Sequence, residues 1–312
     1  MHYASSAEPS AGGSLDPAGP VAARMADLWW WLLALATLVF VVFLVALTRS
    51  LLQRRRPEAP EPWRFIVGGG VVMPVIAVGV VLVLTLNAMR QIPSEIPPGA
   101  VAIEVVGHQW WWEVRYPEED VVTANEIHVP AGRPIGLQLT SNDVIHSFWV
   151  PTLGGKIDLL PGRVNTMVLE ADDVGLHRGS CAEFCGLQHA KMGLLVASES
   201  AEDYQAWLAV QREPASATSG SGQATGAAVF MEAGCPDCHT IRGTDANGSK
   251  GPDLTHLAGR LGLAAGTVSN TSENLLEWVG SPHDVKSGVL MPDPELSRPD
   301  LEALVAYLET LE

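Results

Sequence analysis

The chain has 312 residues, of which 47% are hydrophobic, and carries a formal net charge of −16 at pH 7. Such an acidic balance disfavours nucleic-acid binding and suits a basic protein partner attracted by electrostatic steering. The sequence contains no internal repeat, phosphate-binding glycine loop or hydrolytic triad.

Residues 1–27 form a polar tail that lacks the apolar stretch of a secretory signal peptide. Two uncharged segments follow, Leu28–Thr48 with 21 residues and Phe65–Leu86 with 22. Each is long enough to cross a bilayer core of about 30 Å. The sequence therefore predicts two transmembrane helices within residues 28–90.

The segment between these helices is rich in arginine, whereas the tail carries only Arg24. By the positive-inside rule the connecting loop is cytoplasmic. Both termini, and everything from about Gln91 onward, are then expected outside the membrane. The basic residues are Arg49, Arg54, Arg55, Arg56 and Arg64, against Glu58 and Glu61.

Residues 91–211 are predicted to form an all-β sandwich or barrel. Runs rich in Val, Ile and Thr, such as Val101–Val106, Ile135–Thr140 and Val164–Leu169, are separated by Pro and Gly turns. The aromatic stretch Gly107–Trp112 fits either the barrel core or a membrane-interface belt. Loops at one end of such a scaffold are suited to carry a binding site.

The first of two cysteine clusters lies in this region and combines thiol, imidazole and thioether groups. Such soft ligands select copper, and His146, Cys185, His189 and Met192 would make a mononuclear site. Cys181 would then be one thiolate too many. Two thiolates bridging two coppers, each capped by a histidine, use every ligand, with the Met192 sulfur and the Glu183 carbonyl in the weak positions.

Two other interpretations of this cluster are a Cys181–Cys185 disulfide in an oxidising compartment and a structural zinc site. Neither explains why a methionine stands at position 192.

The cluster resembles the binuclear CuA motif of cytochrome c oxidase subunit II at each of these positions. The resemblance implies a cupredoxin Greek-key barrel. It also implies that Trp110 receives electrons from cytochrome c, or instead faces the tethered haem domain, and that the Glu183 carboxylate reaches a magnesium site at the interface with subunit I.

Residues 212–224, rich in Ala, Ser, Thr and Gly, are predicted to be a flexible linker. Its reach of roughly 20 Å would keep the C-terminal domain, residues 225–312, close to the copper domain.

The second cysteine cluster, Cys-Pro-Asp-Cys-His at 235–239, has the spacing of a c-type haem attachment site. Cys235 and Cys238 would form thioethers to the porphyrin, and His239 would bind the iron. A zinc site would need a second ligand pair, and a thioredoxin-like motif would need a βαβ context. Neither is present in the sequence.

Met291 is predicted to be the sixth haem ligand, because methionine with histidine raises the potential. Met231 lies too close to Cys235, on the same short helix, to reach the opposite haem face. His256 or His283 as ligand, with Met291 as core filler, is the alternative.

The C-terminal region resembles a small all-α class I cytochrome c. The resemblance covers Gly251–Leu254, whose proline backbone supports the haem histidine in that family, and the segment from Pro282 to Pro292. In the final helix Ser297 and Asp300 form a capping-box variant, and Leu301, Leu304, Val305 and Leu308 form one apolar face.

The whole chain is thus predicted to be a bacterial plasma-membrane oxidase subunit II fused to cytochrome c, as in caa-type oxidases. The resemblance implies one haem c, CuA, and electron transfer to haem in subunit I, where oxygen is reduced and protons are pumped. Implied partners are subunits I and III, membrane lipid, and soluble or membrane cytochrome c or a quinol:cytochrome c reductase as donor.

Two alternatives are the electron-input subunit of a copper-dependent nitric oxide reductase and a stand-alone membrane-tethered electron carrier. A quinol oxidase subunit is disfavoured, because that branch lacks these copper ligands. Relatives place a glutamate near the start of the second helix for proton uptake. Phe65–Leu86 has no acid, and Glu61 lies just outside it.

Overall fold

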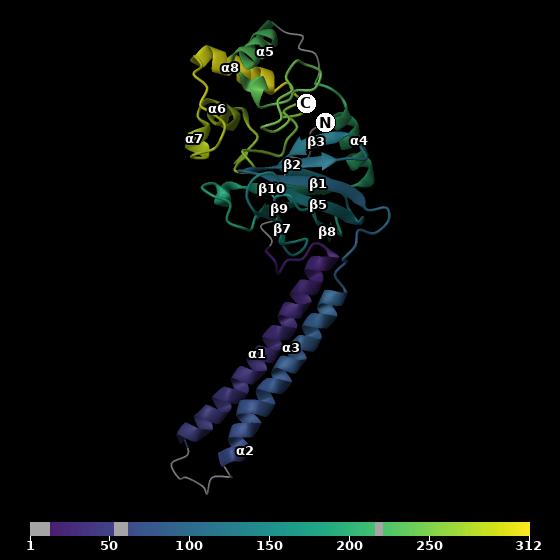
Figure 1. Ribbon diagram of the computed structural model, residues 1–312, viewed down its shortest axis with the longest axis vertical. Helices are drawn as coiled ribbons and strands as arrows, with labels where there is room; N and C mark the ends of the chain where they lie inside the picture. The colour runs from purple at the N-terminus through teal and green to yellow at the C-terminus, as the bar shows by residue number, and fades with distance from the viewer. Residues whose placement is uncertain (1–12, 53–61, 216–220) are drawn as a thin grey trace.

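The computed structural model describes residues 13–52, 62–215 and 221–312. Three parts follow one another along its long axis: a helical pair, a β-sandwich and a helical C-terminal domain (Figure 1). The predicted fold class, a two-helix hairpin before a β domain and a small α domain, is confirmed.

The helical pair projects from the β-sandwich as a long stalk (Figure 1). Its first arm is α1 (Pro20–Leu52), and its second runs through α2 (Pro62–Val67), the π-helical η1 (Gly68–Val72) and α3 (Met73–Arg90). Both arms are long and apolar enough to cross a membrane, by length and composition. Large apolar side chains along them are exposed, as expected for lipid contact.

Both arms exceed their predicted lengths. Helix α1 begins eight residues before Leu28 and reaches Leu52, and the second arm runs from Pro62 to Arg90. The amides of Ala18 and Asp172 link the start of this arm to the β-sandwich, donating to the carbonyls of Thr152 and Ala18 respectively. Most of the predicted cytoplasmic loop, including Arg54, Arg55, Arg56, Glu58 and Glu61, lies outside the described residues.

Ten strands form two five-stranded sheets, ordered β3-β2-β1-β5-β8 and β4-β10-β9-β6-β7. The β1–β5 and β4–β10 pairs are parallel, and the other pairs are antiparallel. The strands are β1 (Val101–His108), β2 (Trp111–Tyr116), β3 (Val121–Ala124), β4 (Glu126–Pro130), β5 (Ile135–Ser141), β6 (His146–Trp149), β7 (Ile157–Leu159), β8 (Asn165–Leu169), β9 (Gly175–Cys181) and β10 (Gly193–Glu199).

The three runs predicted as strands are β1, β5 and β8. In β1 the side chains of Ile103 and Val105 are buried and alternate with less buried neighbours, as a strand with one face on the core requires. The core between the sheets is closed by α4 (Ala201–Arg212), whose Trp207 packs into it.

The C-terminal domain contains α5 (Ser221–Glu232), a 3-10 turn η3 (Cys235–Asp237), β11 (Gly262–Leu263), β12 (Val268–Ser269), α6 (Ser272–Gly280), α7 (Pro282–Val285) and α8 (Arg298–Leu308). Its own core joins α5, α6 and α8. Gly226 lets α5 and α8 approach closely, because a Cβ there would meet the Ala303 carbonyl.

The predicted final helix is α8, and Ser297 caps it by accepting the Asp300 amide at 3.3 Å. Leu304, Val305 and Leu308 are buried in the domain core and Leu301 packs against it, so the predicted apolar face is core.

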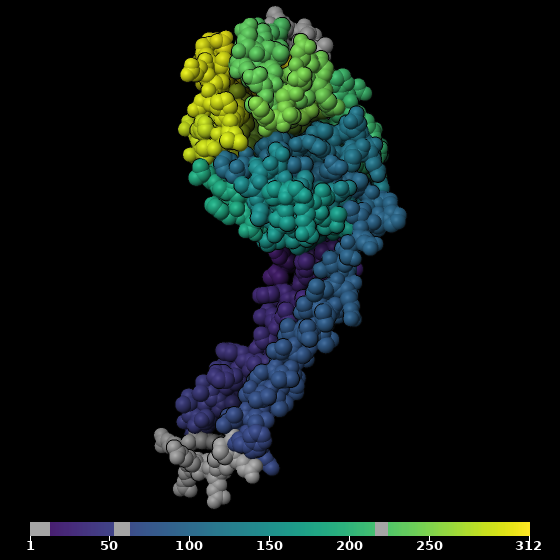
Figure 2. All heavy atoms as spheres, viewed as in Figure 1, coloured from purple at the N-terminus to yellow at the C-terminus, as the bar shows by residue number. Residues whose placement is uncertain are grey.

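The C-terminal domain packs directly on the β-sandwich, with no gap between them in the view of Figure 2. The Gly193 amide donates to the Ala265 carbonyl, and the Leu261 amide donates to the Glu126 carboxylate. Of the predicted linker, residues 216–220 lie outside the described residues, and α5 already begins at Ser221. The Ala215 amide donates to the Arg242 carbonyl.

Candidate functional site

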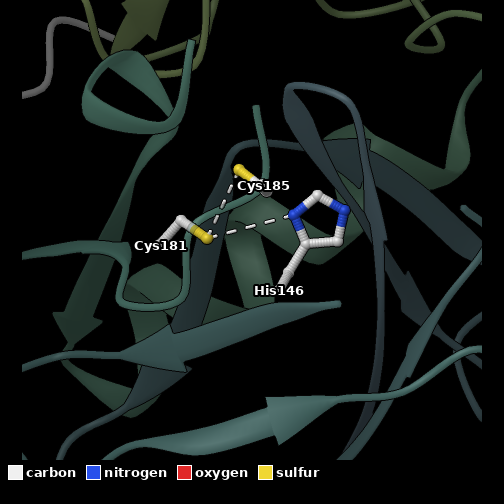
Figure 3. Close-up of side chains that lie close together, drawn as sticks. All are labelled: His146, Cys181 and Cys185. Carbon is white, nitrogen blue, oxygen red and sulfur yellow. Dashed lines mark hydrogen bonds between the residues drawn. The ribbon is translucent and has the colours of Figure 1, made fainter. Parts of the chain in front are cut away.

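Two thiols and two imidazoles alternate at one end of the β-sandwich. His146 begins β6, Cys181 ends β9, and Cys185 and His189 follow in the next loop. Cys181 Sγ lies 3.9 Å from His146 Nδ1 and 3.8 Å from Cys185 Sγ, and Cys185 Sγ lies 3.7 Å from His189 Nδ1. Figure 3 shows the first three side chains converging. Each thiol therefore has its own imidazole nitrogen.

Each thiol also has one weaker donor nearby. The Glu183 carbonyl oxygen lies 3.2 Å from Cys181 Sγ, and Met192 Sδ lies 3.8 Å from Cys185 Sγ. The two cysteines are free thiols. Two soft bridging sulfurs, two imidazoles and two weak donors fit a pair of copper ions.

The site is dry, since His146 and Met192 are 0% exposed and Cys185 only 3%. The hydrogen bond with Cys185 lowers the pKa of the Cys181 thiol against the opposing effect of burial, and the contact with His146 lowers it further. The same hydrogen bond raises the pKa of the Cys185 thiol, so the pair favours one thiolate, on Cys181. The thiolate is the form that binds metal.

The His146 ring is oriented from its far side. Its Nε2 lies 2.8 Å from a carboxylate oxygen of Asp143, so Nδ1 faces the thiols. Gly107 makes room for the ring, because a Cβ there would lie 2.8 Å from His146 Cδ2. The Trp112 ring packs edge-on against it with centroids 6.0 Å apart.

The Glu183 carboxylate, in contrast to its carbonyl, points away from the thiols toward a cation. Its Oε2 lies 3.5 Å from Lys156 Nζ, and both side chains are nearly half exposed. The predicted magnesium at Glu183 stays a prediction.

A cavity of about 470 Å³ lies beside the second cysteine cluster. Its size falls within the range of pockets that hold small ligands and cofactors. The haem-motif residues and apolar side chains of the C-terminal domain line it, together with aromatic residues of the β-sandwich. These lining residues include Cys235, Cys238, His239, Leu254, Trp278, Val279, Met291, Leu304, Trp110 and Trp111. Two thiols, an imidazole and an apolar lining fit a covalently attached haem.

The His239 ring is fixed with one nitrogen available for iron. Its Nδ1 donates to the Pro252 carbonyl at 2.8 Å, which leaves Nε2 as the free acceptor. Burial lowers the pKa of His239, which favours the neutral ligand form. Gly251 permits this approach, since a Cβ there would lie 2.7 Å from His239 Cε1.

Among the candidates for the sixth haem ligand, the structure places Met291 in the cavity wall and gives the two histidines other partners. Met291 lines the cavity. Both ring nitrogens of His256 are taken by the carbonyls of Glu312 and Glu213. The Nδ1 of His283 accepts the Gly288 amide, and Met231 lies on α5 with 43% of its surface exposed.

Trp110 lies between the two cysteine clusters. It lines the cavity beside the haem motif, yet its indole Nε1 donates to the Cys185 carbonyl at 2.9 Å. Gln109 Nε2 donates to the same carbonyl at 2.8 Å. Only 7% of Trp110 is exposed: it packs in the β-sandwich core, and residues of the C-terminal domain line the cavity beside it.

Sequence reasoning missed two residues at these sites, Asp143 and Lys286. Asp143 stands three positions before His146, which was a usable signal for a partner of the histidine ring. Lys286 lies within the segment that precedes Met291, but nothing in the sequence indicates that its ammonium contacts Trp110.

Both the β-sandwich and the C-terminal domain match models of known protein families. A family model described as cytochrome C oxidase subunit II, periplasmic domain, matches residues 119–199, and one described as cytochrome c matches 223–312. The first range contains every predicted copper-site residue, and the second contains every predicted haem residue.

Two curated relatives match along nearly the whole chain. Cytochrome c oxidase subunit 2 of Alkalihalophilus pseudofirmus is 35% identical over 96% of this chain and 90% of its own length. The Bacillus subtilis protein of the same name is 28% identical, covering 96% and 91%. The crystal structure of the periplasmic domain of subunit II of cytochrome oxidase of Bradyrhizobium japonicum matches 38% of this chain and 97% of its own, with 30% identity and a TM-score of 0.37.

Proposed function

The chain belongs to the cytochrome c oxidase subunit II family and carries a cytochrome c domain, and from this we propose that it passes electrons from its own haem c, through a binuclear copper centre, to the haem of subunit I. As an oxidase subunit it is part of an oxidoreductase. In this proposal oxygen is reduced to water in the partner subunit.

Bound copper and haem would supply reversible one-electron chemistry, and the chain's residues hold them apart from water. The proposed copper ligands are His146, Cys181, Cys185, His189 and Met192 with the Glu183 carbonyl. The proposed haem residues are Cys235, Cys238, His239 and Met291.

The position of Trp110 is the observation that carries the proposal. Its ring lines the haem cavity, and the same ring donates a hydrogen bond to the carbonyl of Cys185. One side chain therefore connects the two proposed cofactor sites. We assign to Trp110 the role of receiving electrons from the chain's own haem, and an external cytochrome c is then proposed to deliver electrons to that haem.

Two helices of the protein are long and apolar enough to anchor it in a membrane, and the family model that matches residues 119–199 describes a periplasmic domain. We propose that both termini and both redox domains lie on the periplasmic face of a bacterial plasma membrane, with the 53–61 connection in the cytoplasm. The boundaries proposed for the parts are 91–211 for the copper domain and 225–312 for the haem domain. Proton pumping and contact with subunit III belong to the same proposal.

The proposal is tested by purifying the chain in detergent and counting its cofactors. We expect two coppers and one covalently bound haem per polypeptide, followed by copper reduction after the haem alone is photoreduced. One copper or fewer, or haem that is lost on denaturation, would overturn it.

Identification of the companion chain tests the reaction class. Co-purification of a large polytopic subunit that consumes oxygen supports the oxidase assignment. A companion that reduces nitric oxide, or the absence of any companion, would contradict it.

A further inference from the structure

The two loops that carry the cofactor ligands hold each other. We call residues 181–192 the copper loop and residues 285–291 the methionine loop. Gln188 of the copper loop donates to the Ser287 carbonyl, and Lys191 donates to the Val285 carbonyl. Lys286 of the methionine loop donates to the carbonyl of Trp110, which lies outside the copper loop, at 2.8 Å.

Lys286 is the unusual member of this contact, because its side chain carries an amine and yet only 2% of its surface is exposed. Its ammonium also donates to the Ala264 carbonyl at 3.2 Å. Burial and, to a smaller extent, the neighbouring Lys191 together lower the pKa of Lys286 to about 7. Burying an ammonium is unfavourable, so an apolar side chain of the same length would stabilise a merely structural contact better.

The lysine contacts the backbone carbonyl of Trp110, whereas the copper loop contacts its indole ring. The Trp110 carbonyl accepts from Lys286, while its indole Nε1 donates to the Cys185 carbonyl. The methionine loop, Trp110 and a copper-loop cysteine are thus joined by consecutive hydrogen bonds. This arrangement holds the ring in the wall of the haem cavity.

We propose that Lys286 is a positioning residue that locks the haem domain onto the copper domain in one docked arrangement, with Trp110 between the two cofactor sites and shielded from external donors. The inference rests on the proposed function. In each transfer one electron leaves the ferrous haem iron, which becomes ferric, and the copper pair is reduced by one electron. Lys286 makes and breaks no covalent bond.

The test compares the full-length, cofactor-loaded chain with its K286M variant, which removes the amine and keeps a side chain of similar length. Hydrogen exchange at the Gly193 and Leu261 amides reports docking, because both donate across the domain boundary. We expect both amides to exchange about tenfold faster in K286M, since the hydrogen bonds from the lysine amine to the Trp110 and Ala264 carbonyls are lost.

Two rates give a readout that general destabilisation would not reproduce. Haem-to-copper transfer after flash photoreduction is expected to slow, because the docked arrangement is less populated. Direct copper reduction by a soluble cytochrome c is expected to become faster, because Trp110 is uncovered. Haem and copper spectra should stay at their wild-type positions.

Two further variants complete the design. R298M removes a cation from the exposed surface of α8 on the same domain, and all readouts should match the wild type. K286Q keeps an N–H donor and should lie between K286M and the wild type. It replaces K286M if that variant does not load both cofactors.

Unchanged exchange and unchanged rates in K286M and K286Q would overturn the role of Lys286, as would a parallel fall of both electron-transfer rates. A wild-type chain that holds both cofactors but shows no haem-to-copper transfer would overturn the proposed function instead.

Discussion

Two of the three proposed histidine ligands, His146 and His239, are oriented by a hydrogen bond at the ring nitrogen that does not face the metal site. Asp143 holds Nε2 of His146, and the Pro252 carbonyl holds Nδ1 of His239. A glycine faces each ring, Gly107 in the first case and Gly251 in the second. The residues that set ligand geometry are therefore small or remote from the metal, and they act by fixing tautomer and ring position.

Replacing Asp143 by Asn should weaken copper binding. The amide keeps the shape of the side chain but removes the charge that stabilises the His146 ring with Nδ1 toward the thiols. Loss of such an outer contact typically costs about 10- to 100-fold in metal affinity. Competitive copper titration of the purified chain measures this, and Asp173→Asn, at an exposed position, is the matched control. Equal affinities in the two variants would refute the assigned role of Asp143.

Replacing Gly251 by Ala should disturb the haem histidine. The added methyl group would lie 2.7 Å from His239 Cε1, so the ring must move away from the Pro252 carbonyl. Overpacking of this kind costs about 1–3 kcal/mol. Absorption spectra should show a high-spin haem fraction, whereas Gly259→Ala, with its nearest atom at 3.7 Å, should remain low-spin. A low-spin spectrum in both variants would contradict the expectation.

At the scale of elements, a buried ionic cluster joins β4, β10 and α4. His128 Nδ1 lies 2.7 Å from the Glu199 carboxylate, and its Nε2 lies 3.5 Å from the Glu126 carboxylate. The ring of Trp207 stacks on His128 with centroids 4.3 Å apart. Glu126 also accepts the Leu261 amide, so the cluster reaches the haem domain. Two carboxylates beside one imidazole favour its protonated form.

This cluster predicts a stability that falls at alkaline pH. Burial opposes the charge on His128, but hydrogen bonds with Glu126 and Glu199 prevail and raise its pKa from 6.5 to about 9. A raised pKa stabilises the fold fully below pH 6.5, and that contribution is lost as pH rises through 9. This rise in the pKa of His128 corresponds to about 3 kcal/mol in the free energy of unfolding.

Thermal melts followed by tryptophan fluorescence should therefore show a melting temperature that falls as pH rises from 6.5 to about 9. His128→Gln should be less stable at pH 6.5 and show a flatter profile, because glutamine does not titrate. An equal alkaline fall in this variant would assign the effect to other groups.

At the scale of the whole molecule, the two redox domains have separate hydrophobic cores but a shared boundary. The β-sandwich core includes Cys181, Cys185 and Met192, so its centre and the copper site are continuous. The haem-domain core includes Phe230 and Tyr307, whose rings pack edge-on between α5 and α8. A ligand bound to the native state of one domain stabilises that domain by mass action.

Removal of copper should consequently lower the melting transition of the β-sandwich by several degrees, since saturation at about 100 times the dissociation constant contributes about 2.7 kcal/mol. The haem absorption spectrum should be unchanged. Calorimetry of chelator-treated and reloaded protein, with haem absorbance recorded in parallel, measures both effects. A shift confined to the haem-domain transition would contradict the copper assignment.

The sequence by itself determined the order of the parts and the chemistry of their ligands. Helical spans follow from apolar length, strands from alternation, and the cofactor types from cysteine spacing, all of which depend on residues close together in the chain. Domain docking depends on contacts between distant residues. The bond from Lys286 to Trp110 joins positions 176 residues apart, and its existence depends on the packing of two complete domains. Only the tertiary structure decided that Trp110 lines the cavity beside the haem motif and that a buried lysine donates to its carbonyl.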